Sequence, residues 1–245
     1  MLSCAEIARF KEEGFLIRRS VDSSWVTSRN TEIDRVLTTD GPTSDRRLHR
    51  HIDCRVIHEL AASSVVTDCI ATILGDDLLL WHTRLFDKPP GAPWVPWHQD
   101  AAYWPIEPKV CVSAWIAIDP TDQENGCMKM IPGSHHQPRN HEPTSLGGRF
   151  GREINLTTTE LKQAVDIELM PGDFVIFDRW IVHSSPENQS ERRRVGLSAR
   201  YITTSVQVDF EHVAHSFPGL GAQLVKGEDR HQCNRIAAPP AAVAR

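Results

Sequence analysis

The spacing of apolar residues changes about a third of the way along the chain. Over residues 55–74 apolar positions recur at near-helical spacing, whereas from Leu78 onward short runs of Leu, Val, Ile, Trp and Phe alternate with Pro, Gly, Asn and Asp. Such runs are typical of antiparallel strands in a sandwich or barrel. We therefore predict a mainly β jelly roll with eight strands, over 78–87, 95–100, 110–119, 126–131, 166–170, 173–178, 180–184 and 194–203.

Two helices are expected before these strands. Ser3 and Glu6 form a Ser-x-x-Glu capping box, which predicts a short opening helix that ends at Gly14. Residues 55–74 carry apolar side chains at near-helical spacing and precede Gly75, a residue that commonly ends helices. This second helix is expected to pack on a sheet.

The remaining segments interrupt these patterns. Residues 20–50 are polar and end in a basic cluster at 46–51, which is either a solvated loop or a cationic rim that guides an anionic substrate. Residues 135–165 break the strand pattern, and we expect a lid over the active site there. Residues 1–234 are expected to form one domain, followed by a mobile Ala/Pro tail at 235–245.

Composition limits the class of partner. The 245 residues carry a formal net charge of -5, so no basic surplus points to nucleic acid or an anionic membrane, and a small-molecule substrate is expected. Charged residues interrupt the N-terminal segment, and no run approaches the ~20 apolar residues of a membrane span. The six cysteines form no Cys-x-x-Cys pair, which predicts reduced thiols in the cytoplasm. The oligomeric state is left open.

A metal site is indicated by His98 and Asp100, two residues apart, together with His183 far downstream. Alternate side chains of a strand point the same way, so His98 and Asp100 can converge on one ion while Gln99 faces elsewhere. Two imidazoles and one carboxylate suit ferrous iron and leave three coordination positions open. With 12 histidines in the chain, this spacing alone is weak support.

The surrounding motifs make the signal specific. Together they resemble the phytanoyl-CoA dioxygenase family of iron and 2-oxoglutarate dependent oxygenases, over roughly residues 5 to 205. The motifs are Lys88-Pro89-Pro90, His98-Gln99-Asp100, Asn125-Gly126-Cys127, Pro132-Gly133-Ser134-His135, Pro171-Gly172-Asp173, and His183 with Arg194 eleven residues beyond it.

The resemblance implies a double-stranded β-helix braced by helices, with Fe²⁺ bound by His98, Asp100 and His183. It also implies that Arg194 binds the distal carboxylate of 2-oxoglutarate, for which a guanidinium fork is well suited. Ser185 matches a position that assists Arg194. The implied reaction consumes O2, releases succinate and CO2 and hydroxylates the substrate. Related halogenases have a small residue in place of Asp100, so its retention favours hydroxylation.

Other assignments stay open at this stage. Gln99 and Trp115 resemble co-substrate contacts, although either could simply pack in the core. Arg84 is expected in the pocket beside 2-oxoglutarate, an acidic side chain such as Asp87, or an anionic substrate. Five aromatic residues near the ligand segments suggest an aromatic-lined cavity; these are Trp94, Trp97, Tyr103, Trp104 and Trp180.

Alternative functions would use the same fold and many of the same residues. The same oxidant could desaturate, epoxidise or cyclise a substrate, because these outcomes differ only in substrate pose. A different metal enzyme of the same fold is a further option, although Arg194 with Ser185 argues against it. The alternative of another class is a non-catalytic cupin-like binding module.

Overall fold

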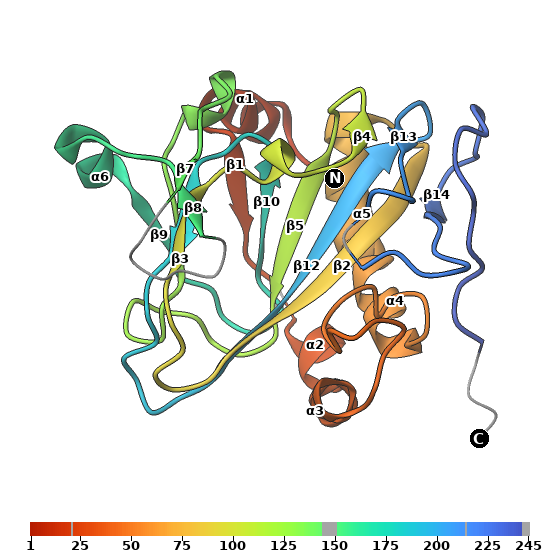
Figure 1. Ribbon diagram of the computed structural model, residues 1–245, viewed down its shortest axis with the longest axis horizontal. Helices are drawn as coiled ribbons and strands as arrows, with labels where there is room; N and C mark the ends of the chain where they lie inside the picture. Colours follow the sequence, from red (N-terminus) through yellow and green to blue (C-terminus); the bar gives the residue numbers. More distant parts are fainter. Residues whose placement is uncertain (21, 144–150, 214, 242–245) are drawn as a thin grey trace.

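Two antiparallel sheets face each other and form the predicted jelly roll in the computed structural model, which describes residues 1–20, 22–143, 151–213 and 215–241 (Figure 1). The larger sheet has the order β1 (Phe15–Arg18), β10 (Phe174–Asp178), β5 (Val112–Ala117), β12 (Arg194–Thr203), β2 (Leu78–Lys88) and β14 (Gln223–Lys226). The smaller sheet has the order β3 (Val95–His98), β11 (His183–Ser185), β6 (Met128–Met130) and β9 (Val165–Ile167). Two short ladders pair β4 (Ile106–Glu107) with β13 (Gln207–Val208), and β7 (Glu142–Pro143) with β8 (Arg152–Glu153).

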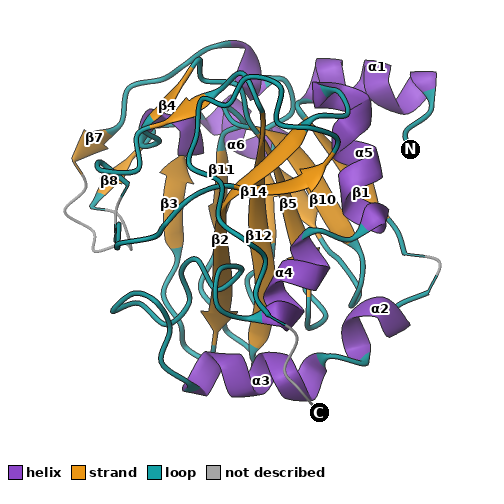
Figure 2. Ribbon diagram, turned by 90° about the vertical axis from the view of Figure 1, so that its right-hand side faces the viewer, coloured by secondary structure: helices purple, strands orange, loops and turns teal. Residues whose placement is uncertain are grey.

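Helices cover the outer face of the larger sheet (Figure 2). They are α1 (Cys4–Glu13), α2 (Ser24–Thr27), α3 (Asn30–Thr38), α4 (Arg55–Ala61) and α5 (Ser64–Leu74). The predicted capping box is present at the start of α1, and Gly14 ends the helix in the left-handed conformation. The short helices η1 (Asp100–Ala102), η2 (Ser134–His136) and α6 (Thr158–Gln163) lie in connections.

Each of the eight predicted strands overlaps an observed strand, but the helical prediction needs correction. The single helix expected over 55–74 is two helices, α4 and α5, bent by 46°. Ser63 lies at the break, where its side chain accepts a hydrogen bond from the backbone N–H of Val65 and caps α5. Neither helix alone meets the length and apolarity of a membrane span within the described chain, whereas the bent pair does so by composition; its apolar side chains pack in the core.

Three segments were expected to lack regular structure and have some. Residues 20–50 contain α2 and α3, whose Ile33 and Val36 are buried in the core. The expected lid at 135–165 contains η2, the β7–β8 ladder and α6, and its residues 144–150 lie outside the described residues. At the start of the expected tail, backbone hydrogen bonds join Ala222 to both Arg235 and Ala237.

Apolar side chains form two main layers. One lies between the helices and the larger sheet, and the other lies between the two sheets and includes Trp115, Met128, Val175 and Phe177. Adjacent strand residues point to opposite faces, so alternate residues of β5 and β10 serve these two layers. The second layer borders the cavity that contains the predicted site residues.

Candidate functional site

The predicted ligand residues come together at one end of the smaller sheet. His98 ends β3, His183 begins β11, and these two residues are register partners. Their imidazole rings are 4.1 Å apart between centroids, and one ligand atom from each of His98, Asp100 and His183 lies within 4.8 Å of the others. The expectation that β3 extends to residue 100 is wrong. The strand ends at His98 and Asp100 opens η1, so the turn out of the strand brings its carboxylate Oδ1 to 3.4 Å from His98 Nε2.

Backbone carbonyls fix the orientation of both imidazoles. Nδ1 of His98 is 2.7 Å from the carbonyl oxygen of Pro96, and Nδ1 of His183 is 3.0 Å from that of Ile181. A carbonyl oxygen can only accept, so each Nδ1 carries a proton, which leaves Nε2 as the ring atom that can bind a metal. Burial, reinforced by His98, lowers the pKa of His183 to about 4, which keeps this ring neutral as a metal ligand requires.

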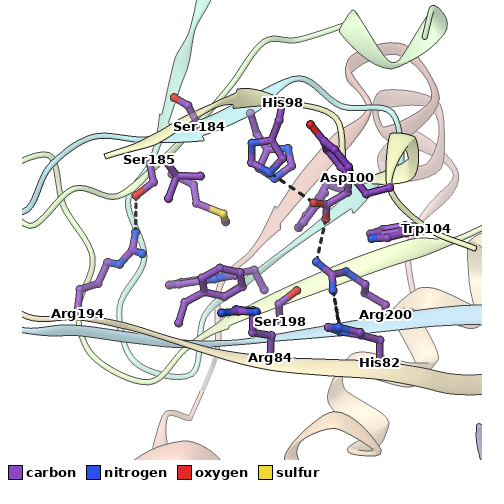
Figure 3. Close-up of a pocket in the computed structure, with 17 residues that line it drawn as sticks. His82, Arg84, His98, Asp100, Trp104, Ser184, Ser185, Arg194, Ser198 and Arg200 are labelled. Carbon is purple, nitrogen blue, oxygen red and sulfur yellow. Dashed lines mark hydrogen bonds and ion pairs between the residues drawn. The ribbon is translucent and has the colours of Figure 1, made fainter. Parts of the chain in front are cut away.

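Arg200 holds the carboxylate of Asp100. Its Nη2 donates to Asp100 Oδ2 at 3.2 Å, its Nη1 donates to His82 Nδ1 at 2.7 Å, and its guanidinium lies 4.8 Å from the ring centre of Trp104 (Figure 3). Burial alone would raise the pKa of Asp100, but the positive charge of Arg200 outweighs it and brings this pKa well below its usual range. The carboxylate is therefore ionised, with one oxygen near the imidazoles and the other bound by Arg200.

Arg194 lies at the other end of the cavity. It begins β12, is 3% exposed, and donates from Nη1 to Ser185 Oγ at 3.2 Å and to the carbonyl of Gly126. Its guanidinium lies 5.3 Å from the ring centre of Trp115. Burial lowers its pKa to about 10, so Arg194 remains a cation at neutral pH. A carboxylate is the natural ligand for a buried cation in this geometry.

Ser185 joins several hydrogen-bond partners at the Arg194 end of the cavity. Its hydroxyl donates to the Gly126 carbonyl at 2.8 Å and accepts from Lys88 Nζ at 2.8 Å as well as from Arg194. Lys88 is buried, and its ammonium also donates to the backbone carbonyl of Pro186. This hydrogen bonding holds Ser185 and Arg194 in one fixed arrangement.

A cavity of about 290 Å³ joins the two ends between the sheets. His98, Asp100 and His183 line it at one end and Ser185 and Arg194 at the other, while Trp115 contributes to its wall. The predicted position of Trp115 in the pocket is thus compatible with its 3% exposure, because the indole serves both as wall and as core.

Gln99 does not line the cavity, contrary to its expected contact with the co-substrate. Its amide is fully buried on the other side of the chain, where its nitrogen donates to the backbone carbonyls of Gln137 at 2.9 Å and Trp180 at 2.6 Å. Its oxygen accepts from the backbone N–H of Arg139. Gln99 therefore anchors the segment after η2, in agreement with the alternation that turns it away from its neighbours His98 and Asp100.

Arg84 lines the cavity as expected, but its acidic partner is not Asp87. Its Nη2 donates to Asp45 Oδ2 at 2.8 Å, whereas Asp87 pairs with Arg47. The basic cluster at 46–51 is not a simple cationic rim, since Arg50, His49 and His51 are buried. Arg50 donates to backbone carbonyls and to Asp53.

The other residues predicted to lie near the site are also found partly inside and partly outside the cavity. Of the five aromatic residues near the ligand segments, Tyr103 and Trp104 line the cavity, whereas Trp94, Trp97 and Trp180 do not. Trp97 and Trp180 pack against two different apolar clusters. Arg192 and Arg193 form surface ion pairs and leave Arg194 as the buried arginine. No described residue of the expected lid lines the cavity.

Sequence reasoning missed Arg200, His82, Lys88 and Ser198. Arg200 and Ser198 lie six and four residues after Arg194, on the same strand face, so the even spacing on β12 was a usable signal. His82 pairs in register with Arg200, which is a contact between strands distant in sequence. Lys88 stands out in the sequence only as part of the Lys-Pro-Pro turn motif.

Comparisons with known proteins agree with this geometry. The phytanoyl-CoA dioxygenase (PhyH) family model matches residues 1–196. A probable phytanoyl-CoA dioxygenase of Caenorhabditis elegans is 28% identical over 177 residues, covering 66% of this chain and 55% of that protein. This chain thus spans about half the length of that relative. A 2-aminoethylphosphonate dioxygenase from an uncultured bacterium is 25% identical over 204 residues, covering 78% of this chain and 74% of that protein.

Solved structures extend the likeness to the whole fold. CytC3, determined with Fe(II) and alpha-ketoglutarate, is 26% identical and aligns with a TM-score of 0.77 over 97% of this chain and 93% of its own. The family match covers most of the chain, and the fold match covers nearly all of it. The chain therefore belongs to the phytanoyl-CoA dioxygenase (PhyH) family, a family of 2-oxoglutarate-dependent dioxygenases.

Proposed function

We propose that this chain is an Fe(II)- and 2-oxoglutarate-dependent dioxygenase that hydroxylates a small organic metabolite and releases succinate and CO2. The observation that carries the proposal is the grouping of His98, Asp100 and His183 ligand atoms within 4.8 Å of one another in the inter-sheet cavity. Two imidazoles and one carboxylate are the donor set of a facial triad with open positions. This donor set fits Fe(II).

Each residue has a separate task in this proposal. His98, Asp100 and His183 hold the metal, and the carbonyl bonds of the two imidazoles keep their Nε2 lone pairs directed at it. Arg194, assisted by Ser185, binds the distal carboxylate of 2-oxoglutarate. Fe(II) with 2-oxoglutarate and O2, when bound, supplies an oxidant for unactivated C–H bonds.

The chain's own contribution is placement and exclusion of water. Trp115, Phe177 and Met128 make the middle of the cavity apolar, which disfavours water beside the reacting groups. Arg200 keeps Asp100 ionised and oriented. Retention of the Asp100 carboxylate supports hydroxylation over halogenation, and product analysis would distinguish hydroxylation from desaturation, epoxidation or cyclisation.

Anaerobic titration of the protein with Fe(II) and then 2-oxoglutarate tests the proposal. A weak visible charge-transfer band should appear only when both are present. His183→Ala should abolish Fe(II) binding, whereas Arg194→Met should retain Fe(II) binding and weaken 2-oxoglutarate binding by about tenfold to a hundredfold, as expected for loss of a charge-assisted pair.

The neighbouring arginine provides the matched control. Arg193→Met removes a surface cation that pairs with Asp34 and Asp119, so both titrations should match those of the wild type. Intact protein that binds neither Fe(II) nor 2-oxoglutarate would reject the proposal and favour a non-catalytic binding module. Succinate release in a screen of candidate metabolites would then identify the substrate.

Three further parts of the proposal concern organisation. We propose that residues 1–234 act as one oxygenase domain, that 135–165 acts as a lid, and that the protein works in the cytoplasm. All six cysteines are unpaired thiols, as a reducing compartment would allow. Unchanged proteolysis between Arg139 and Arg152 on addition of 2-oxoglutarate and substrate would argue against the lid.

A further inference from the structure

The floor of the cavity carries a second group of polar residues, separate from Arg194 and Ser185. Arg84 on β2 and Ser198 on β12 are register partners, and His82 and Arg200 form the adjacent pair on the same two strands. All four line the cavity. Figure 3 shows Ser198 between Arg84 and Arg200, across the cavity from His98 and Asp100.

Apolar side chains separate this floor group from Arg194. Phe86 on β2 and Trp115 on β5 lie between the two groups, and Gly196, the β12 residue midway between Arg194 and Ser198, is covered by the Trp115 indole. A dicarboxylate bound at Arg194 and reaching the metal ligands would therefore leave the floor group for another molecule.

The charges of the lining leave an excess of positive charge. Arg84, Arg194 and Arg200 face one carboxylate, Asp100, which is an excess of two among the described lining residues. Just behind the lining, Asp45 pairs with Arg84 and the buried Lys88 donates to Ser185, so one negative and one positive charge are added and the excess stays at two. Bound Fe(II) and the 2-oxoglutarate dianion cancel each other and leave this excess unchanged. A cavity with a net positive charge and an apolar middle is complementary to an anion with an apolar body.

The floor residues have different partners. Arg200 is fixed by Asp100, His82 and the face of Trp104. Arg84 pairs with Asp45, which comes from the loop after α3 and whose side chain is 24% exposed. The Ser198 hydroxyl makes no hydrogen bond to another residue in the described part of the chain, although Ser198 is 2% exposed. Arg84 and Ser198 thus offer two adjacent donors at one place.

We propose that the substrate is an organic anion, whose carboxylate or similar oxyanion group binds Arg84 and Ser198. This inference rests on the proposed function and adds the class of its substrate. Arg84 exchanges part of its pairing with Asp45 for the substrate oxyanion. The apolar body of the substrate lies against Tyr103 and Trp104, beside the metal ligands.

A matched pair of probes tests the charge requirement. Phenylacetate and phenylacetamide have nearly the same shape, and only the first is an anion. Protein held anaerobically with Fe(II) and saturating 2-oxoglutarate is titrated with each probe by calorimetry, so that Arg194 is already occupied. Phenylacetate should bind at least about tenfold more tightly than phenylacetamide, the effect expected for one charge-assisted hydrogen bond.

Two variants break the same salt bridge and should act in opposite directions. Arg84→Met should weaken phenylacetate binding by about tenfold or more, whereas Asp45→Asn removes the competing carboxylate and should strengthen it. Arg84→Lys, which keeps the charge, should retain part of the affinity. Arg47→Met, which removes the nearby Arg47–Asp87 pair, is the control and should leave binding unchanged.

The outcomes separate this inference from the proposed function. If 2-oxoglutarate does not bind in the first titration, the proposed function fails. If 2-oxoglutarate binds but both probes bind alike, or phenylacetate does not bind at about 10 mM, the anionic substrate is refuted. Equal weakening by Arg84→Met and Asp45→Asn would also refute it, because it would mean that the salt bridge only supports the fold.

Discussion

Gly196 on β12 leaves space for the indole of Trp115, and replacing it by alanine should disturb the cavity directly. A Cβ at position 196 would lie 2.0 Å from Trp115 Cζ2 and 2.3 Å from Cη2, whereas ordinary contacts begin near 3.4 Å. Trp115 is 3% exposed and cannot turn outward, so the ring or the strand must shift by about 1.4 Å. Overpacking of this kind costs about 1–3 kcal/mol.

The gain from replacing glycine offsets part of this loss of stability. Alanine in a strand recovers about 0.5–1 kcal/mol of backbone entropy relative to glycine, so we expect Gly196→Ala to lower the free energy of unfolding by about 1 kcal/mol. For a chain of this length that lowers Tm by about 2–4 °C. The Arg194 guanidinium lies over the Trp115 ring, so a displaced indole should also weaken 2-oxoglutarate binding by about tenfold.

A double-mutant cycle tests the cause. Urea unfolding and calorimetric titration with 2-oxoglutarate are measured for Gly196→Ala, Trp115→Phe and the double variant. Phenylalanine is smaller than tryptophan and leaves room for the methyl group, so the double variant should be more stable than the sum of the single losses predicts. Strictly additive losses, or a Gly196→Ala protein with wild-type stability and affinity, would refute the steric explanation.

Three other predictions follow from buried groups. Arg200→Met should destabilise the metal-free protein by about 3 kcal/mol in urea unfolding, because Asp100 would be buried without its counter-charge, and saturating Mn(II) should reduce this loss. Gln99→Ala should increase proteolysis after η2, because the amide no longer holds the backbone of Gln137 and Arg139. His49→Asn should make stability less dependent on pH, because burial, reinforced by Arg200, lowers the pKa of His49 to about 4.

The sign of the pH effect follows from where His49 binds its proton. The unfolded chain protonates His49 near its ordinary pKa of 6.5, whereas the folded protein resists protonation until about pH 4. Stability is therefore full above pH 6.5 and falls as the pH drops toward 4, by about 2 kcal/mol at pH 5 for this one group. His49→Asn, which tolerates the φ of 54° at this position, should remove that part of the loss between pH 7.5 and pH 5.

Each of these predictions has a contrary outcome. If Arg200→Met lowers the free energy of unfolding equally with and without Mn(II), Asp100 does not bind the metal. Unchanged cleavage in Gln99→Ala would mean that the segment after η2 is held by other contacts. An identical pH profile for His49→Asn would place the acid-sensitive groups elsewhere, with buried His51 and His82 as the next to examine.

Local sequence patterns determined most strands of this protein and the residue types of its candidate site. The eight runs of apolar residues correspond to strands because alternation and turn residues act over a few positions, and the capping box defined α1 for the same reason. The family motifs predicted that His98, Asp100 and His183 come together and that Arg194 shares their cavity. The break between α4 and α5 was missed because their apolar spacing continues through Ser63.

Only the tertiary structure decided which of these residues meet. Arg200 reaches Asp100, Arg84 pairs with Asp45, and Lys88 reaches Ser185 through contacts between residues 39 to 100 positions apart in the chain. A sequence shows residue types and local spacing, but sheet order and register determine which side chains share a cavity. The sequence thus determined the strands and the donor set, and the packing of the two sheets determined the charge and shape of the space around it.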